Sequence, residues 1–95
     1  MSLNLYSEAG NIGEVSTNKG WGDIITALTP LILDDADYEN LKDFLTEGST
    51  DEPELVRVEL SKILNAHTLA DHIRPSVENL LSLMRKAREI AIVSV

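Results

Sequence analysis

His67, Asp71 and His72 form the only cluster in this 95-residue sequence that resembles a catalytic or metal-binding constellation. Imidazole and carboxylate groups transfer protons and ligate metal ions. On a helix, His67 and Asp71 would share a face, but His72 would lie roughly 140° around the axis from His67. The i, i+4 histidine pair that chelates zinc is therefore missing, and no cysteine or third histidine completes a site. We predict no metal site and no cofactor, and we interpret Asp71 as a helix cap.

Other catalytic patterns are equally weak. No serine lies in a Gly-x-Ser-x-Gly setting, and Gly10, Gly13, Gly20 and Gly22 match neither common phosphate-binding spacing. These glycines are more typical of turns. The sequence therefore predicts a protein that is not an enzyme, and a small enzyme that uses His67 or His72 stays a remote alternative.

The chain has 16 acidic and 8 basic residues, and one segment holds the whole excess. Residues 34–59 carry ten acids against two cations, a net charge of −8, whereas residues 1–33 carry −2 and residues 60–95 carry +2. The predominant expectation for acids on helices is a solvated face, but on two consecutive helices they can also form one negative surface. Such a surface favours a basic protein partner through charge complementarity. The candidate partner-binding residues are Trp21, Asp34, Asp35, Asp37, Glu39, Asp43, Glu47, Asp51, Glu54 and Glu59.

The same charge argues against two other classes of partner. A negative field repels phosphate backbones and anionic lipids, so we expect neither nucleic acid nor membrane binding. Residues 56–64 and 68–73 have lengths that suit a helix-turn-helix, but Asp71 would stand in the recognition helix. The longest apolar run, residues 90–93, is far short of the ~20 residues that span a membrane. The absence of cysteine fits a reducing compartment, and we predict a cytoplasmic protein.

Trp21 is one of few aromatic residues, which make up 4% of the chain, and it lies between Gly20 and Gly22. A buried tryptophan would anchor the first helix, whereas an exposed one would be a contact for a partner. The scarcity of aromatic side chains favours the core anchor, and the partner contact stays open.

The elements that position these residues begin with two short strands. Residues 3–17 alternate weakly and enclose glycines at Gly10–Gly13, which predicts a hairpin with its turn there. Helical spacing starts at Asn18, with Thr17 or Asn18 as the cap. We expect this first helix to end near Leu28, because Pro30 lacks a backbone donor and disfavours helical geometry before it.

Three further helical patterns follow. The first is capped at Asp34 or Asp35 and ends at Gly48, and the second opens at Pro53 with a capping box formed by Asp51 and Glu54. In the third, residues 68–91 keep one apolar phase that contains Pro75. Either one helix kinks there, or a one-turn helix capped by Thr68 and Asp71 ends and a new helix starts at Pro75. We favour the break, because proline is tolerated at a helix start.

Beyond Arg88 the chain becomes β-branched, so residues 90–95 can form a strand beside the hairpin, with helix as the open alternative. The sequence predicts one α+β domain over residues 1–95, mainly helical, with four to five helices and a small sheet of an N-terminal hairpin and the C-terminal segment. Its predicted function is that of an inhibitor, immunity-type or accessory factor that binds a basic partner. The alternative is a structural homo-oligomer that associates through the C-terminal helix and the free edge of a strand at residues 90–95.

Overall fold

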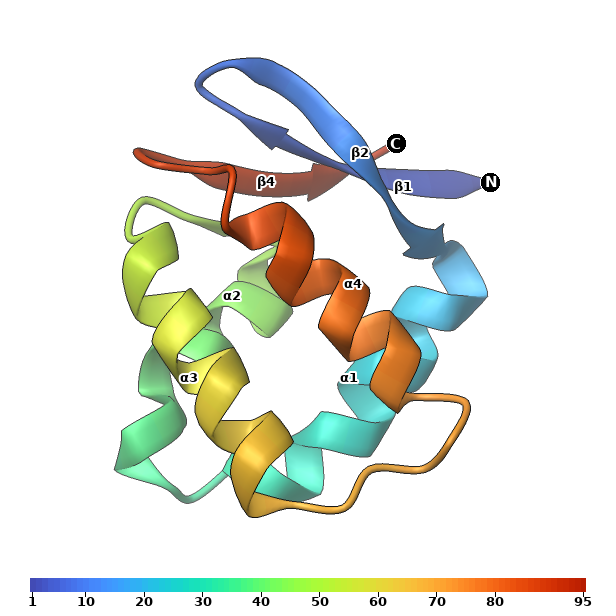
Figure 1. Cartoon of the computed structure of the whole chain (residues 1–95), viewed down its shortest axis with the longest axis vertical. Coiled ribbons are helices and arrows are strands. Elements are labelled where there is room, and N and C mark those ends of the chain that lie inside the picture. Colours follow the sequence, from blue (N-terminus) through green and yellow to red (C-terminus); the bar gives the residue numbers. More distant parts are fainter.

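The computed structural model describes all 95 residues and begins with the predicted hairpin, formed by β1 (Ser2–Ser7) and β2 (Gly10–Thr17) (Figure 1). The turn is not where we predicted it. The chain reverses at residues 8–9, Ser7 pairs with Gly10, and Gly10 has the positive φ of 99° that a tight turn requires. Gly13 lies within β2, where an added Cβ would come 2.9 Å from Leu83 Cδ2. This glycine therefore allows a helix to pack closely on the strand.

The C-terminal segment forms a strand, β4 (Ala91–Ser94), as predicted. It pairs with β1 in antiparallel register, with Leu5 opposite Val93. Its other edge pairs with an unpredicted short strand, β3 (Ser49–Thr50), which gives the antiparallel order β2-β1-β4-β3. The strand edge that was expected to be free for self-association is therefore covered in part, because β3 pairs with Ala91 and Ile92.

The first helix, α1 (Asn18–Ile32), is capped as predicted, with Thr17 Oγ1 accepting a hydrogen bond from the Gly20 N–H at 3.0 Å. Its predicted end near Leu28 is wrong, because the helix continues through Pro30. Pro30 lies on the exposed side of α1. The carbonyl one turn earlier, which receives no hydrogen bond because Pro30 has no N–H, therefore faces solvent. Continuing the helix buries Ile32 in the core, which offsets the lost hydrogen bond.

The acidic segment folds into a 3-10 turn, η1 (Ala36–Tyr38), and the helix α2 (Glu39–Glu47). Asp35 caps the turn by accepting from the Asp37 N–H at 2.9 Å. The predicted C-cap is confirmed, because Gly48 adopts the left-handed conformation and donates to Phe44 O at 2.7 Å.

Two longer helices complete the fold: α3 (Pro53–Ala66) and α4 (Arg74–Met84). Proline lies in the first turn of each, so the predicted break before Pro75 is confirmed. Both predicted capping boxes are wrong. The N-cap of α3 is Glu52, not Asp51, and it makes no side-chain capping bond. Residues 67–73 form no helix that Thr68 could cap.

The helices pack beneath one face of the sheet (Figure 1), and 21 buried apolar residues form a single core cluster. The sheet contributes buried side chains such as Leu5 and Ala91, and every helix contributes the apolar stripe expected from its periodicity. The predicted α+β class is confirmed, and the four α-helices fall within the predicted four to five, although the sheet has four strands. No helix combines the length and apolarity that a membrane-spanning segment requires.

Candidate protein-binding site

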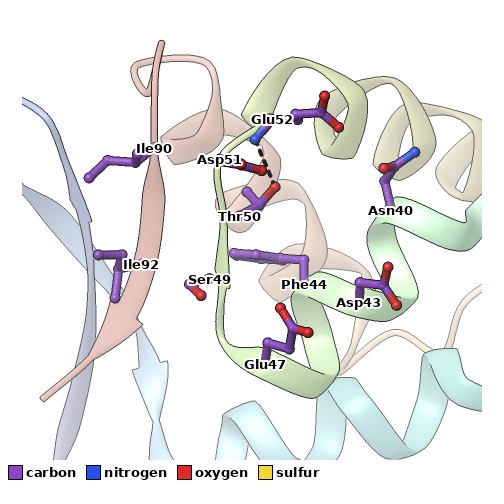
Figure 2. Close-up of a pocket in the computed structure, with 10 residues that line it drawn as sticks. All are labelled: Asn40, Asp43, Phe44, Glu47, Ser49, Thr50, Asp51, Glu52, Ile90 and Ile92. Atoms are coloured by element: carbon purple, nitrogen blue, oxygen red, sulfur yellow. Dashed lines mark hydrogen bonds between the residues drawn. The ribbon is translucent and has the colours of Figure 1, made fainter.

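An open groove of about 460 Å³ lies between α2, β3 and the start of β4 (Figure 2). Four exposed carboxylates line it, and three of them belong to the predicted set. The remaining lining residues are an amide, two hydroxyl residues and three apolar residues. We call this hollow the acidic groove; its lining residues are Asn40, Asp43, Phe44, Glu47, Ser49, Thr50, Asp51, Glu52, Ile90 and Ile92.

The local sequence explains why these carboxylates meet. Asp43 and Glu47 are one helical turn apart and share a face of α2. Gly48, with φ 75°, then reverses the chain so that β3 brings Asp51 and Glu52 back toward that face (Figure 2). The acids thus come from two elements joined by one glycine cap.

No cation neutralises the acidic groove. The structure has one ion pair within 4.0 Å, between Arg74 and Glu78, and neither residue lines the groove. Like charges at i, i+4 on a helix destabilise it by about 0.2–0.5 kcal/mol per pair. Glu47 adds a further cost, because it is the last residue of α2 and faces the negative end of the helix dipole. The groove therefore retains carboxylates that do not favour the fold.

The apolar part of the groove comes from the middle of the chain and from its C-terminal part. Phe44 is fully buried, and Ile90 and Ile92 remain 37% and 39% exposed. On the core side, Phe44 contacts Trp21 edge to face, with ring centroids 6.2 Å apart and an interplanar angle of 82°. Trp21 is half-buried and packs against the core cluster, but it does not line the groove.

The other predicted acids lie outside the groove. Asp34, Asp35, Asp37 and Glu54 are exposed, and Asp35 is the cap of η1. Glu39 is exposed at the start of α2, one turn before Asp43. The groove therefore brings together three of the predicted acids, Asp43, Glu47 and Asp51, while these five lie exposed outside it.

Glu59 requires a correction, because its side chain is 6% exposed and its carboxylate has internal partners. Oε1 accepts from the Leu41 N–H at 2.8 Å, and Oε2 accepts from Asn40 Nδ2 at 2.7 Å. Glu59, on α3, thus caps the N-terminus of α2, whose own N-cap residue Tyr38 provides no side-chain bond. Burial and the neighbouring acids Asp35, Asp37 and Glu59 raise the pKa of the Tyr38 phenol.

Sequence reasoning missed two further charged caps. Arg57 Nη1 donates to the carbonyls of Met84 and Ala87 at 3.0 and 2.6 Å, where α4 ends. Glu8 accepts from three consecutive backbone N–H groups, at residues 88–90. These donors, with that of Glu89 first, lower the pKa of the Glu8 carboxyl from 4.5 to about 2. The partners are 27–30 and 80–82 residues away along the chain, and no sequence pattern signals such pairs.

The histidine cluster does not have the helical geometry considered from the sequence. His67 is half-buried directly after α3, and Asp71 and His72 are exposed in the turn before α4. No group of three or more histidine, cysteine or acidic side chains has the proximity that a metal ion requires. Comparison of the chain with protein-family models, with curated proteins and with solved structures finds no match.

Proposed function

We propose that this chain is a non-enzymatic interaction protein that binds a basic segment of a partner protein in the acidic groove. The observation that carries the proposal is the set of four exposed carboxylates, without any paired cation, around one groove with an apolar base. Neither histidine lines the groove, so the alternative of an enzyme that uses His67 or His72 would need a site elsewhere.

The chemistry of the groove defines the partner segment. Lysine or arginine side chains would meet Asp43, Glu47, Asp51 and Glu52, and an apolar side chain would meet the exposed faces of the two isoleucines. The charges would raise the association rate and exclude acidic competitors. Contact with the isoleucines would add apolar burial, which salt does not screen.

A charge-matched pair of variants tests the proposal. Asp43→Lys/Glu47→Lys reverses two groove charges, and Asp34→Lys/Asp37→Lys reverses two exposed charges outside the groove. The probe is a fluorescein-labelled peptide of alternating lysine and leucine, followed by anisotropy. We expect the groove variant to bind the peptide at least about tenfold more weakly, and the affinity of the control to change by less than about threefold. Charges next to the bound peptide interact with it more strongly than distant charges, which salt screens.

The ionic strength gives a second readout. Affinity of the wild-type chain for the peptide should fall as salt rises from about 50 to 300 mM, because the Debye length shortens over that range. Equal weakening in both variants would show that net charge, rather than the groove, attracts the peptide, and the proposal would be rejected. A partner retained from lysate by the wild-type chain and by the control, but lost with the groove variant, would extend the result to a natural protein.

A further inference from the structure

A second groove, of opposite charge, lies between α3 and α4, the two helices that face the viewer in Figure 1. It consists of two adjoining hollows of about 300 and 390 Å³. The hollows share four lining residues, Ser61, Asn65, Leu81 and Arg85, so they form one continuous groove. We call it the basic groove, and it shares no lining residue with the acidic groove.

Four cations line the basic groove, Arg57, Lys62, Arg74 and Arg85, against one carboxylate, that of Glu78. They are half of the eight cations in a chain whose net charge is −8. This groove therefore has a local excess of positive charge on an acidic chain.

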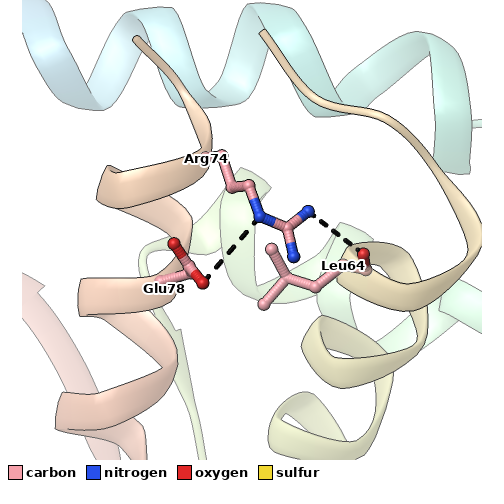
Figure 3. Close-up of polar contacts among 3 residues, drawn as sticks. All are labelled: Leu64, Arg74 and Glu78. Carbon is pink, nitrogen blue, oxygen red and sulfur yellow. Dashed lines mark hydrogen bonds and ion pairs between the residues drawn. The ribbon is translucent and has the colours of Figure 1, made fainter. Parts of the chain in front are cut away.

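Two of the guanidinium groups are held in place by the protein itself. Arg57 is fixed by the carbonyls at the end of α4, as described above. Arg74 Nη1 donates to Leu64 O at 3.3 Å, and its Nε lies 3.8 Å from Glu78 Oε2 (Figure 3). A guanidinium has five N–H donors, so each keeps donors that no group of the chain uses. Binding a carboxylate there would cost little side-chain entropy.

The basic groove also has apolar surface. Val58 lines it and is 50% exposed. Leu64 and Leu81 contribute to its base. A phosphate backbone would leave these side chains without partners, whereas a peptide with apolar residues would cover them.

We propose that the basic groove binds an acidic amphipathic segment of a second protein, so that the chain can bridge a basic and an acidic partner. Carboxylates of the segment meet the arginines and Lys62, and its apolar side chains pack on Val58 and the partly exposed Leu64. The net charge of −8 and the carboxylate of Glu78 oppose a nucleic acid in the same place. Binding at the basic groove does not depend on the acidic groove, because the two sites have separate lining residues, whereas the bridging role rests on the proposed function.

A pair of neighbouring variants tests it. Arg85→Glu reverses a charge that lines both hollows, and Lys86→Glu makes the same change in charge at the next residue, which lines neither. Both side chains are exposed and make no hydrogen bond within the chain, so both variants should fold. The probe is a fluorescein-labelled peptide of glutamate and leucine, about 16 residues long, with leucines spaced for one helical face.

We expect Arg85→Glu to weaken binding of this peptide at least about tenfold and Lys86→Glu less than about threefold. Binding of the lysine–leucine peptide to the acidic groove should not change in Arg85→Glu, which separates failure of this proposal from failure of the first. The proposal is overturned if the wild-type chain does not bind the acidic peptide, or if both variants weaken it equally. Tighter binding of a single-stranded oligonucleotide than of the peptide would overturn it as well, and so would an Arg85-dependent dimer that excludes the peptide.

Discussion

Substitution of Glu59 should destabilise the protein more than any other change to an acidic residue. Glu59→Ala leaves the Leu41 N–H, on a fully buried residue, without an acceptor, at a cost of about 1–3 kcal/mol. It also removes one buried methylene group, worth about 0.8 kcal/mol. Asn40 is only half-buried and its amide can donate to water instead, so the loss of its hydrogen bond adds little to the destabilisation. We therefore expect the free energy of unfolding to fall by about 3 kcal/mol.

Glu59→Gln separates the charge from the shape of the side chain. The amide keeps both methylene groups and can accept from the Leu41 N–H as a neutral group, which is roughly half as strong as a charged acceptor. We expect a loss of about 1 kcal/mol for this variant. The order of stability should be wild type, then Glu59→Gln, then Glu59→Ala.

Urea unfolding followed by Trp21 fluorescence measures these differences. Trp21 is the only tryptophan and contacts Phe44 of α2, the helix that Glu59 caps. The control is Glu54→Ala, the same change on the same helix at an exposed residue, which should lose at most about 1 kcal/mol of dipole stabilisation. If Glu59→Ala lowers the free energy of unfolding no more than Glu54→Ala does, the internal cap does not stabilise the protein and the reasoning is refuted.

Three further predictions concern charged residues that sequence reasoning treated alike. The pKa of Glu8 falls on folding from 4.5 to about 2. Its ionised carboxylate therefore stabilises the fold above pH 4.5, and this stabilisation is lost as the pH falls toward 2. The difference in urea midpoint between wild type and Glu8→Gln should narrow over that range. Arg57→Ala should lower the free energy of unfolding by about 1–2 kcal/mol, because two carbonyls at the end of α4 lose a charged donor; thermal unfolding measures it, and an unchanged midpoint would contradict it. Asp43→Asn should raise the free energy of unfolding by about 0.4–1 kcal/mol, because it removes two i, i+4 repulsions on α2; lower stability in urea unfolding would contradict this.

Local patterns predicted most of the elements. The apolar stripes identified the buried faces of the helices, and Gly48, Pro53 and Pro75 marked boundaries that depend on backbone conformation alone. The β-branched C-terminus correctly indicated a strand. These features depend on residues within one or two turns of each other, which is the range that a sequence pattern covers.

The errors arose where distant residues decide the outcome. The burial of Ile32 in the core keeps α1 helical past Pro30, and local propensity does not contain that term. The strand β3 has two residues and exists because β4 pairs with it, so its own sequence carries no strand signal. The capping of α2 also depends on a distant residue. A nearby Asp was expected as the cap, but Glu59 of α3 accepts the hydrogen bond from the helix.

The sequence predicted the acidic composition of the candidate site but not its location in the fold. The sequence located the excess of acids at residues 34–59, but it could not tell which carboxylates share a groove. That depends on the reversal at Gly48 and on β4, which brings Ile90 and Ile92 to acids about 40 residues earlier in the chain. Glu52, left out of the predicted contacts, lines the groove for the same reason.

The helix α3 carries charges that the fold uses, and substitution should distinguish them from charges that the fold does not need. It places Glu59 at the N-terminus of α2 and Arg57 at the C-terminus of α4, so each charge meets the helix end of opposite sign. Such residues have partners within the chain, and their substitution should lower stability. The groove acids Asp43 and Glu47 have none, so their substitution should weaken binding while stability stays the same or rises. A parallel loss of stability and binding in Asp43→Lys/Glu47→Lys would place these acids with the structural charges and remove the basis of the acidic groove.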